Sequence, residues 1–557
     1  MTICGFKLTH DGSIALIDGN QLVFCYEMEK LNNSPRYSPF NISMDQVREI
    51  FSLHGYDFDR VDKWVIDGWT PHEPVFIDLG KGNIPVDLAG YGSFIVKENV
   101  MQPVHFELQS ENREKYNSYL HVSGHIAAAY CTSPMAKAGV DSYILIWDGG
   151  MYPQLFYYYS STNKVENLGA LFPIIGNIYG IFAQHFGPFK VNKEVVTDEL
   201  NIAGKVMAYI AKGVYIKEMI PVFGSIYKEY AHRGMDFARD FAREFIKKTK
   251  HLQYRPEDIL HTFHVYIEQL LVSALVAKVK KREDRTRNLC FAGGSALNIK
   301  WNSAIRNSGV FATVWIPPFP NDAGSAIGTA CCEMIHETGV NCLNWDVFSG
   351  PSVINDAAVS GWSKKPVTID ALALLLFLEN EPVVFLNERA ELGPRALGNR
   401  SILSPATPAQ MKQVLNHIKH REDYRPVAPI CLEEDAKDIF EPGIRDPYML
   451  FDHQVKPEWK ERIPAVCHLD GTARLQTVNE SENPVMFRLL SEYKKLSGIP
   501  LLCNTSANHN GKGFFPDVSS AMNWGKVNYV WSGGALYEKT EKIIFKSSEF
   551  SDPSIRI

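Results

Sequence analysis

The stretch ICGFKLTHDGSIALIDGNQLVFCYEME, residues 3–29, predicts three successive β-strands joined by tight turns. The runs 3–8, 13–18 and 21–29 are rich in apolar, β-branched and aromatic residues, and the segments between them contain the Asp-Gly pairs that favour turns. A helical pattern follows before residue 70. The chain therefore begins as a mixed α/β structure.

Strands and helices continue to alternate along the chain. Short strands are expected within 142–171, and apolar residues at three- and four-residue spacing predict helices over 234–251 and 264–282. The segments 287–298 and 311–335 each combine a buried strand, a glycine- or proline-rich loop and the start of a helix. This order is typical of the α/β class.

The length of the chain indicates more than one domain. A chain of 557 residues exceeds what one ordinary hydrophobic core accommodates. The segment 347–366 is short, polar and rich in turn-forming residues, and β-type runs alternate with helices again beyond it. We therefore expect two α/β domains, 1–350 and 367–557, with the junction at 351–366.

Charge and cysteine content narrow the class of protein. The net charge of −6 at pH 7 gives no overall attraction to nucleic acid or to an anionic membrane. The ten cysteines follow no CxxC pattern, and residues 1–13 lack the features of a signal peptide. The stretch 167–189 is long enough to span a bilayer, but its glycines, prolines and polar residues favour a buried, interrupted segment. We expect a soluble, cytoplasmic protein without a membrane or nucleic-acid partner.

Two histidines raise the question of a metal site. His121 and His125 are four residues apart, so in a helix both imidazoles project from one face. Asp148 ends an apolar strand, and Asp322 precedes a small-residue helix start. Two imidazoles and two carboxylates suit a divalent first-row metal such as iron, manganese or zinc. On spacing alone the ordinary roles are favoured, with Asp322 capping its helix and Asp148 in a β-turn.

Two glycine-containing turns suit phosphate binding. The first presents His10, Asp11 and Gly12 between two strands, and the second presents Gly293 and Gly294 between a strand and a helix. Backbone amides in such turns near a helix N-terminus bind phosphate oxygens. The sequence contains no Walker motif.

A series of motifs resembles one enzyme family. In chain order they are HDGS (10–13), CYEMEKLNNSPRY (25–37), HVSGH (121–125), WDGG (147–150), GKVMAYIAKG (204–213), AGGSALN (292–298), PPFPNDAGSAIG (317–328), ELGPRALGNRSIL (391–403), KHREDYRPVAP (419–429), HLDGTARLQTV (468–478) and GIPLLCNTSANHNGKG (498–513). The series resembles the O-carbamoyltransferases of the NodU/CmcH/TobZ type, and GPRALGNRS is its most specific part. The short N-terminus and EKLNNSPRY are similar to the branch that tailors antibiotics and toxins.

The resemblance implies a fold and a ligand set for each domain. It implies an N-terminal actin/Hsp70/sugar-kinase-like domain, as in tRNA threonylcarbamoyl transferases, and a C-terminal YrdC-like α/β domain that makes carbamoyl-adenylate. It also implies a metal, Fe2+ ahead of Mn2+ or Zn2+, beside a nucleotide. The implied metal ligands are His121, His125, Asp148 and Asp322. ATP, with Mg2+, is the expected co-substrate, and the implied nucleotide-binding residues are Asp11, Gly12, Lys205, Gly293, Gly294 and Asn298.

Cationic side chains beyond residue 388 suit the carbamoyl phosphate that the family uses. Carbamoyl phosphate is a small dianion, and forked guanidinium groups bind phosphate oxygens bidentately. The expected binding residues are Arg389, Arg395, Arg400, Lys419, Arg421, Arg425, Arg474, Asn504 and Thr505. The alternatives are a solvated basic face and an RNA-binding patch, but glycines and prolines separate these residues where RNA binding would favour aromatic ones. Lys512 stands where the family usually has glutamate.

The implied reaction has two steps. The C-terminal domain converts carbamoyl phosphate and ATP into carbamoyl-adenylate, with Arg395 and Arg425 stabilising the developing negative charge. The N-terminal domain then transfers the carbamoyl group to a hydroxyl of a small natural product. His10 is the candidate base for that hydroxyl, and its alternative role is a turn residue that shapes the phosphate loop. The sequence does not identify the acceptor, and a homodimer is suggested only by the family.

Three other functions fit parts of the sequence. A sugar-kinase-like phosphotransferase would use the first fold but leaves the arginine-rich second domain unexplained. A tRNA threonylcarbamoyl-type modifier would share the chemistry, although the acidic balance of the chain argues against a tRNA partner. A non-catalytic nucleotide-binding or scaffolding protein would need the fold but not the complete ligand set.

Overall fold

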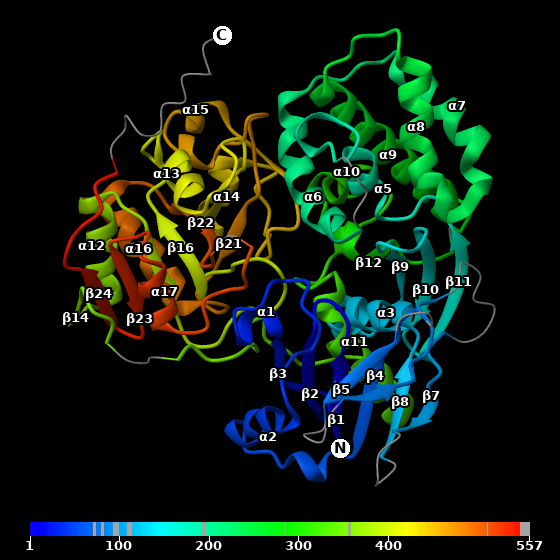
Figure 1. The fold of residues 1–557 in the computed structure, drawn as a ribbon, viewed down its shortest axis with the longest axis horizontal. Helices are drawn as coiled ribbons and strands as arrows, with labels where there is room; N and C mark the ends of the chain where they lie inside the picture. Colours follow the sequence, from blue (N-terminus) through cyan, green and yellow to red (C-terminus); the bar gives the residue numbers. More distant parts are fainter. Residues whose placement is uncertain are drawn as a thin grey trace. The chain divides into compact units, whose positions relative to one another are not determined.

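The computed structural model shows two compact units (Figure 1). It describes residues 1–70, 74–78, 83–92, 100–108, 114–191, 196–282, 284–354, 358–509 and 511–545. Unit 1 comprises Met1–Glu27 and Tyr37–Asp346, and unit 2 comprises Met28–Arg36 and Val347–Ile557. Both units combine helices with β-sheets, so the expected α/β class is confirmed. Residues 28–36 pack with the C-terminal part of the chain, which no pattern in the sequence indicates.

The first sheet of unit 1 contains the strands predicted from residues 3–29. Across the sheet the strands are β3 (Gln21–Glu27), β2 (Ser13–Asp18), β1 (Thr2–Lys7), β4 (Lys63–Asp67), β8 (Lys115–Tyr119) and β7 (Val104–Glu107). β1, β2 and β3 pair antiparallel, as their tight turns require, whereas β4 runs parallel to β1 and β8. Lys7 and Asp67 are therefore the last residues of two adjacent parallel strands, at the same edge of the sheet.

The second sheet of unit 1 brings two distant loops together. Its strands, in order, are β11 (Lys164–Ala170), β10 (Gln154–Tyr159), β9 (Ser142–Ile146), β12 (Asn288–Ala292) and β13 (Thr313–Trp315). β9 and β12 are parallel neighbours. Asp148 follows β9 and Gly293 follows β12, so these residues lie at one edge of the sheet although the chain separates them widely.

Two helices fill the space between these sheets (Figure 1). α3 (His121–Cys131) packs on β9 and β12, α11 (Ser325–Thr338) packs on β1, β2 and β4, and the two helices pack on each other. Every residue of α3 is buried. The helices approach so closely that a Cβ atom on Gly328 would lie 2.0 Å from the carbonyl oxygen of Gly124.

A group of helices forms the rest of unit 1. Its helices pack around stacked phenylalanine rings and are α5 (Ile178–Ala183), α6 (Val196–Tyr209), α7 (Met219–Tyr230), α8 (Phe237–Thr249) and α9 (Pro256–Val279).

The stretch 167–189 is divided between β11, α5 and a 3-10 turn, which agrees with the predicted interrupted segment. Among the described residues, α9 alone is long and apolar enough to cross a membrane, and half of its most apolar window is buried in the protein. The remaining elements of unit 1 are α2 (Met44–Leu53), α4 (Pro134–Ala138), α10 (Ile299–Asn307), β5 (Val75–Asp78) and β6 (Asn83–Val86).

Unit 2 is built on one eight-stranded sheet. Its strands, in order, are β14 (Trp362–Pro366), β24 (Ala535–Lys539), β23 (Tyr529–Ser532), β15 (Val383–Leu386), β16 (Arg400–Ser404), β22 (Leu501–Ser506), β17 (Ala428–Leu432) and β21 (Gln476–Val478). The other elements are α1 (Met28–Leu31), α12 (Ile369–Glu379), α13 (Met411–Ile418), α14 (Glu433–Ile439), α15 (Pro457–Lys460), α16 (Pro484–Ser497), α17 (Val518–Trp524), β18 (Phe440–Glu441), β19 (His453–Val455) and β20 (Thr472–Ala473). One continuous hydrophobic core joins the sheet to these helices.

Residues 28–36 are bound to the loop that carries Lys512. The side-chain amide of Asn33 donates to the carbonyls of Gly513 and Phe514, at 2.8 and 3.0 Å. The backbone amide of Phe514 donates to the carbonyl of Glu29 at 2.8 Å. A Cβ atom on Gly513 would lie 2.0 Å from that same carbonyl oxygen, so only glycine fits there.

The contact between α3 and α11 predicts a stability defect. Gly328→Ala should lower the free energy of unfolding by about 1–3 kcal/mol, because the added methyl group overlaps the α3 backbone. Gly224→Ala is the matched control, since a Cβ atom at that position of α7 meets nothing within 4 Å. Thermal unfolding of both variants checks the prediction, and equal midpoints would contradict the close contact.

Candidate functional site

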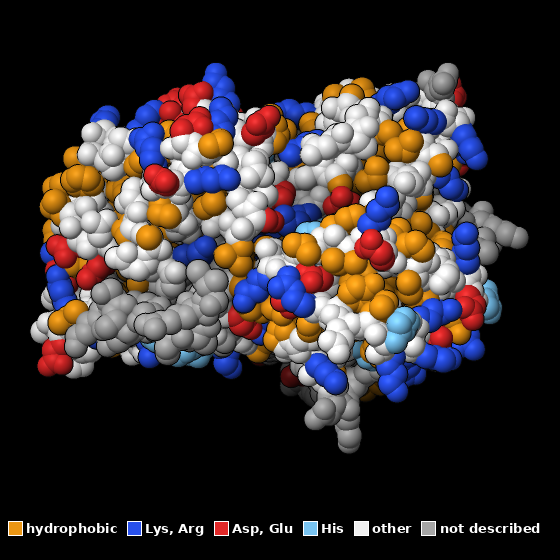
Figure 2. All heavy atoms as spheres, turned by 90° about the horizontal axis from the view of Figure 1, so that it is seen from above, with side chains coloured by type: hydrophobic (Ala, Val, Ile, Leu, Met, Phe, Trp, Pro, Cys, Tyr) orange, Lys and Arg blue, Asp and Glu red, His pale blue; other side chains and the backbone are white. Residues whose placement is uncertain are grey.

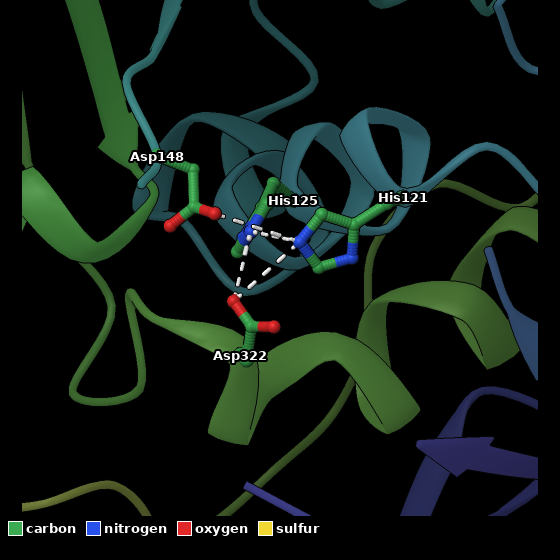
Figure 3. A group of neighbouring side chains, drawn as sticks. All are labelled: His121, His125, Asp148 and Asp322. Carbon is green, nitrogen blue, oxygen red and sulfur yellow. Dashed lines mark hydrogen bonds and ion pairs between the residues drawn. The ribbon is translucent and has the colours of Figure 1, made fainter. Parts of the chain in front are cut away.

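The four candidate metal ligands converge in unit 1 (Figure 3). His121 and His125 come from the first turns of α3, Asp148 from the loop after β9, and Asp322 from the short turn just before α11. All four side chains are buried. Asp322 is not the N-cap residue of α11, because Gly324 holds that position and no side-chain capping bond is formed there. The sandwich of sheets and helices therefore assembles the set that the sequence scatters over two hundred positions.

The donor atoms of this cluster have the spacing of a first-row metal site. Nε2 of His121 lies 3.1 Å from Nε2 of His125, 3.5 Å from Oδ1 of Asp322 and 3.8 Å from Oδ2 of Asp148. Nε2 of His125 lies 3.6 Å from Oδ1 of Asp322. An ion about 2.1 Å from each donor would place neighbouring donors about 3.0–3.4 Å apart. The residues fit a divalent ion with small adjustments.

Two contacts fix Asp148. The backbone amide of Gly294 donates to its Oδ1 at 2.6 Å, and the hydroxyl of Tyr91 donates to its Oδ2. The Tyr91 ring also stacks on His121, with ring centroids 4.6 Å apart. The sequence did not single out Tyr91, because a lone tyrosine in a loop carries no motif.

Lys7 and Asp67 lie beside the cluster and were also missed by the sequence analysis. Lys7 Nζ is 3.0 Å from Oδ2 of Asp67 and 2.9 Å from Oδ2 of Asp322. Oδ2 of Asp67 is in turn 2.7 Å from Nδ1 of His121. Both residues appear in the sequence as ordinary ends of apolar strands, and only the sheet pairing brings them together.

Charges within the cluster set its protonation. Burial opposes the charge on His121, but Asp67 and then Asp322 outweigh it and raise the pKa of His121 well above its ordinary value. Burial likewise opposes the charge on Asp322, while Lys7, His121 and His10 hold the pKa of Asp322 well below its ordinary value. Asp148 has a lowered pKa despite its burial and the nearby Asp322, because His121 and His125 favour its charge.

His10 lies at the rim of the cluster. Its Nδ1 is 2.9 Å from Oδ2 of Asp11, and its Nε2 is 3.6 Å from Oδ2 of Asp322. Burial lowers the pKa of His10, but Asp322 and Asp11 outweigh burial and raise it. The side chain keeps 30% of its surface exposed, unlike the four candidate ligands. The position suits a group that exchanges a proton with an incoming molecule.

The predicted phosphate turns have other hydrogen-bonding roles in the structure. The amides of Gly293 and Gly294 donate to the Pro320 carbonyl and to Asp148, and the amide of Gly12 donates to the Ser38 carbonyl. The side chain of Asn298 caps α10. These three amides therefore already have partners within the protein, and phosphate binding by the two turns stays a prediction. Asp11 accepts a hydrogen bond from Asn321 at 3.0 Å, beside the metal cluster, and Lys205 lies on α6.

A cationic cluster lies in unit 2. Burial and mutual repulsion lower the pKa of Arg395 well below its ordinary value, with Arg474, Arg36, Arg425 and Arg421 as the repelling charges. Burial and the neighbouring arginines also lower the pKa of Arg421 to about 9 and that of Arg474 to about 10. Nε of Arg421 and Nε of Arg474 are buried without a hydrogen-bond acceptor among the described residues. Like charges held together in this way favour an anionic ligand.

Other residues predicted for this site hold its framework. Arg400 donates to the carbonyls of Asn387, Asn399, Pro351 and Glu388 at 2.8–3.0 Å, and Arg389 donates to the carbonyls of Ser349 and Gly350. These contacts favour a structural role for both arginines, and we do not carry them into the proposed anion site. The sequence could not separate them from the other arginines, because all stand in one motif-rich stretch.

Lys419, Thr505 and Asn504 border the cationic cluster. The ammonium of Lys419 donates to Asn508 and Ser506, and its pKa is lowered well below the ordinary value by burial, Arg421 and Arg425. The hydroxyl of Thr505 accepts from Arg421 at 3.1 Å. Asn504 donates to the Ala396 carbonyl and to Gln476, and its Oδ1 is buried without a donor among the described residues. This oxygen is available to accept a hydrogen bond from a ligand.

Comparison with known proteins identifies the family. The family model for the carbamoyltransferase N-terminus matches residues 2–331, and the model for the carbamoyltransferase C-terminus matches residues 375–539. The chain belongs to the carbamoyltransferase family. This carbamoyltransferase is 45% identical over 561 residues to nodulation protein U of Rhizobium tropici, which covers 97% of this chain and 96% of the relative. The sequence-based resemblance is confirmed.

Two further likenesses differ in strength. The carbamoyltransferase is 32% identical over 536 residues to 3'-hydroxymethylcephem-O-carbamoyltransferase of Amycolatopsis lactamdurans, covering 94% of this chain and 96% of the relative. Among solved structures, an archaeal actin homologue aligns with 59% of this chain and 98% of its own, at 10% identity and a TM-score of 0.25. The second likeness is too weak to carry an argument.

Family membership excludes two of the alternative functions considered from the sequence. Membership of a carbamoyltransferase family identifies an enzyme of carbamoyl transfer, which excludes a phosphotransferase and a non-catalytic scaffold as its primary role. Lys and Arg side chains are interspersed with Asp and Glu over the face drawn in Figure 2.

Removal of one imidazole should empty the metal site. The purified protein should carry about one divalent ion per chain, and His125→Ala should lose most of it while remaining folded. His336→Ala is the matched control, since His336 is an exposed histidine on α11. Elemental analysis of the purified variants checks the metal content, and a full complement of metal in His125→Ala would show that the ligands are misassigned.

Metal binding should release a proton. Since Asp67 and Asp322 raise the pKa of His121 well above its ordinary value, a proton competes with the metal for His121. The apparent affinity should therefore fall as the pH falls, by about tenfold per pH unit for one proton. Calorimetric titration in two buffers of different ionisation enthalpy measures the protons released, and a value near zero would contradict the assignment.

Proposed function

We propose that this carbamoyltransferase moves the carbamoyl group of carbamoyl phosphate, by way of carbamoyl-adenylate, to a hydroxyl of a small natural product. The cationic cluster of unit 2 carries the proposal, because Arg421 and Arg474 there have buried Nε donors with no acceptor among the described residues. The name of one relative specifies a hydroxymethyl acceptor and O-carbamoyl transfer, which supports a hydroxylated acceptor here. ATP is the proposed co-substrate, with Mg2+.

The first step takes place at the cationic cluster. Arg395, Arg421, Arg425 and Arg474 bind the phosphate of carbamoyl phosphate, which relieves their mutual repulsion. Water cleaves the carbon–oxygen bond, and phosphate leaves. A carbamate oxygen then attacks the α-phosphate of ATP, which forms carbamoyl-adenylate and releases pyrophosphate. The arginines stabilise the negative charge that develops during both displacements.

Asn504 contributes a complementary group to this site. Its Oδ1 is a buried acceptor, and the carbamoyl group is the part of the substrate that carries N–H donors. An acceptor at this point favours an amide over a carboxylate of the same shape, because a carboxylate would leave Oδ1 unsatisfied. Asn504 therefore distinguishes carbamoyl phosphate from acetyl phosphate and similar anions.

The second step takes place at the metal cluster of unit 1. His121, His125, Asp148 and Asp322 would hold a divalent ion, with Fe2+ ahead of Mn2+ or Zn2+, and the bound ion supplies Lewis-acid polarisation of the carbamoyl carbonyl. His10 takes the proton of the acceptor hydroxyl as its oxygen bonds to the carbamoyl carbon. AMP leaves, and Asp11 keeps the imidazole of His10 oriented through Nδ1.

The two steps predict opposite defects. Arg425→Ala should reduce transfer from carbamoyl phosphate and ATP by about a hundredfold or more, whereas transfer from supplied carbamoyl-adenylate should change little. His121→Ala should still release pyrophosphate but fail to transfer the carbamoyl group. Arg488→Ala is the control in unit 2, since Arg488 is exposed and pairs only with Asp370 among the described residues.

Two assays separate the steps. Pyrophosphate release measures formation of the adenylate, and labelled carbamoyl transfer to a panel of hydroxylated natural products measures the second step. Arg395→Ala repeats the first test at another arginine of the cluster, with circular dichroism as the check on folding. Equal loss of both activities in the arginine and histidine variants would mean one shared site, contrary to the proposal.

A further inference from the structure

Lys7 and Asp67 form a buried ion pair that is not part of the candidate ligand set. Nζ of Lys7 lies 3.0 Å from Oδ2 of Asp67, and the side chains are 1% and 0% exposed. They end the adjacent parallel strands β1 and β4, whose register pairs Phe6 with Ile66. Because a buried ion pair is costly to desolvate, it is retained where its geometry serves another purpose.

Each member of the pair holds one candidate ligand. Oδ2 of Asp67 lies 2.7 Å from Nδ1 of His121, which directs the opposite nitrogen, Nε2, toward the other three ligands. Nζ of Lys7 lies 2.9 Å from Oδ2 of Asp322. The remaining oxygen of Asp322, Oδ1, is the one that lies 3.5 and 3.6 Å from the imidazole nitrogens.

The pair is itself held in place. Oδ1 of Asp67 accepts a hydrogen bond from the hydroxyl of Thr329 at 3.3 Å, and Lys7 Nζ lies 4.2 Å from the centroid of the Trp69 ring. A Cβ atom on Gly124 would lie 3.0 Å from Oδ1 of Asp67, so a side chain at that position of α3 would press on the carboxylate. Both oxygens of Asp67 therefore have partners in the structure.

The charges of the site agree with a role for Lys7 and Asp67 in positioning the ligands. The two carboxylate ligands balance a divalent ion, and Lys7 and Asp67 balance each other, so the pair orients the ligands without changing the net charge of the site. Loss of one member would leave the other buried without its counter-charge.

We propose that the Lys7–Asp67 pair is a positioning device that fixes how the metal is bound. It commits His121 to bind through Nε2 and commits Asp322 to bind through Oδ1 alone. A carboxylate that accepts from the far nitrogen of a metal-binding histidine fixes its tautomer, and its loss weakens metal binding about 10- to 100-fold in other proteins. The inference rests on the metal site of the proposed function and adds two residues to it.

The test measures Co2+ binding to the full chain after removal of bound metal. Co2+ reports affinity through calorimetry and coordination through its visible absorption bands. Asp67→Asn and Lys7→Met should each weaken Co2+ binding about 10- to 100-fold and alter the absorption spectrum. The spectrum is the decisive readout, because a general loss of stability lowers occupancy but leaves the spectrum of the bound ion unchanged.

Glu333→Gln is the matched control. Glu333 is a fully buried carboxylate on α11 that accepts from Tyr119 at 2.6 Å and from Asn117 at 2.9 Å, and it contacts none of the four candidate ligands. It should bind Co2+ with the affinity and spectrum of the unaltered protein. Thr329→Val is a milder second variant, which should weaken binding about two- to fivefold through the lost hydrogen bond to Asp67. It decides the question if Asp67→Asn does not fold.

The double variant Lys7→Met/Asp67→Asn tests whether the pair acts as one unit. Its loss of affinity should be smaller than the product of the two single losses, because each single variant leaves an uncompensated charge. A loss equal to that product would show that the residues act separately and would overturn the paired device. Unchanged affinity and spectrum in both single variants would also overturn it.

His125→Ala separates this inference from the proposed function. If His125→Ala abolishes Co2+ binding while the Asp67 and Lys7 variants behave like the unaltered protein, the metal site stands and the positioning role is wrong. If His125→Ala binds Co2+ normally, the metal site itself is misassigned and the proposed function fails with it.

Discussion

The contact between α3 and α11 is the constraint on which the first unit depends. Each helix covers one sheet, and their backbones meet where Gly124 and Gly328 have no side chains. This approach sets the histidines of α3 against the aspartate that precedes α11. A larger residue at the contact would push the two helices apart, and with them both the sheets and the candidate ligands. The packing of the core and the geometry of the site therefore depend on the same contact.

The second unit depends on a constraint of a different kind, because it holds several arginines close together although their like charges repel. Backbone carbonyls accept four hydrogen bonds from the two terminal nitrogens of Arg400, whereas the Nε atoms of Arg400, Arg421 and Arg474 are all buried without an acceptor among the described residues. The burial of apolar side chains in the core of the unit must offset the unfavourable free energy of this charge repulsion. The folded unit is therefore less stable when the site is empty, and binding of an anion should raise its free energy of unfolding.

Much of the fold could be predicted from the sequence because its strands and helices have strong local patterns. Residues 3–29, 142–171 and 287–298 form strands close to where alternation and turns place them. The four candidate ligands were also identified, although the family resemblance decided them, since their spacing alone favoured a cap and a turn. Lys7, Asp67, Tyr91 and Arg36 were missed, because their importance arises from strand pairing and loop packing that no local pattern records.

The contact that Gly294 makes within the protein was not predicted from the sequence, for a similar reason. A glycine pair between a strand and a helix is compatible with phosphate binding or with holding a neighbouring side chain. In this fold the parallel pairing of β9 and β12 puts Asp148 within reach of the Gly294 amide, which uses the donor. The competing acceptor lies far away in the chain, so only the three-dimensional structure could show this contact.

The assignment of residues 28–36 to unit 2 has a consequence for how the protein is made. The chain passes between the units at residues 27/28, 36/37 and 346/347, so no single cut separates them. During synthesis from the N-terminus, residues 28–36 emerge early but find Gly513 and Phe514 only after unit 1 and most of the second unit have been made. The second unit is therefore completed by one of the earlier segments to be translated.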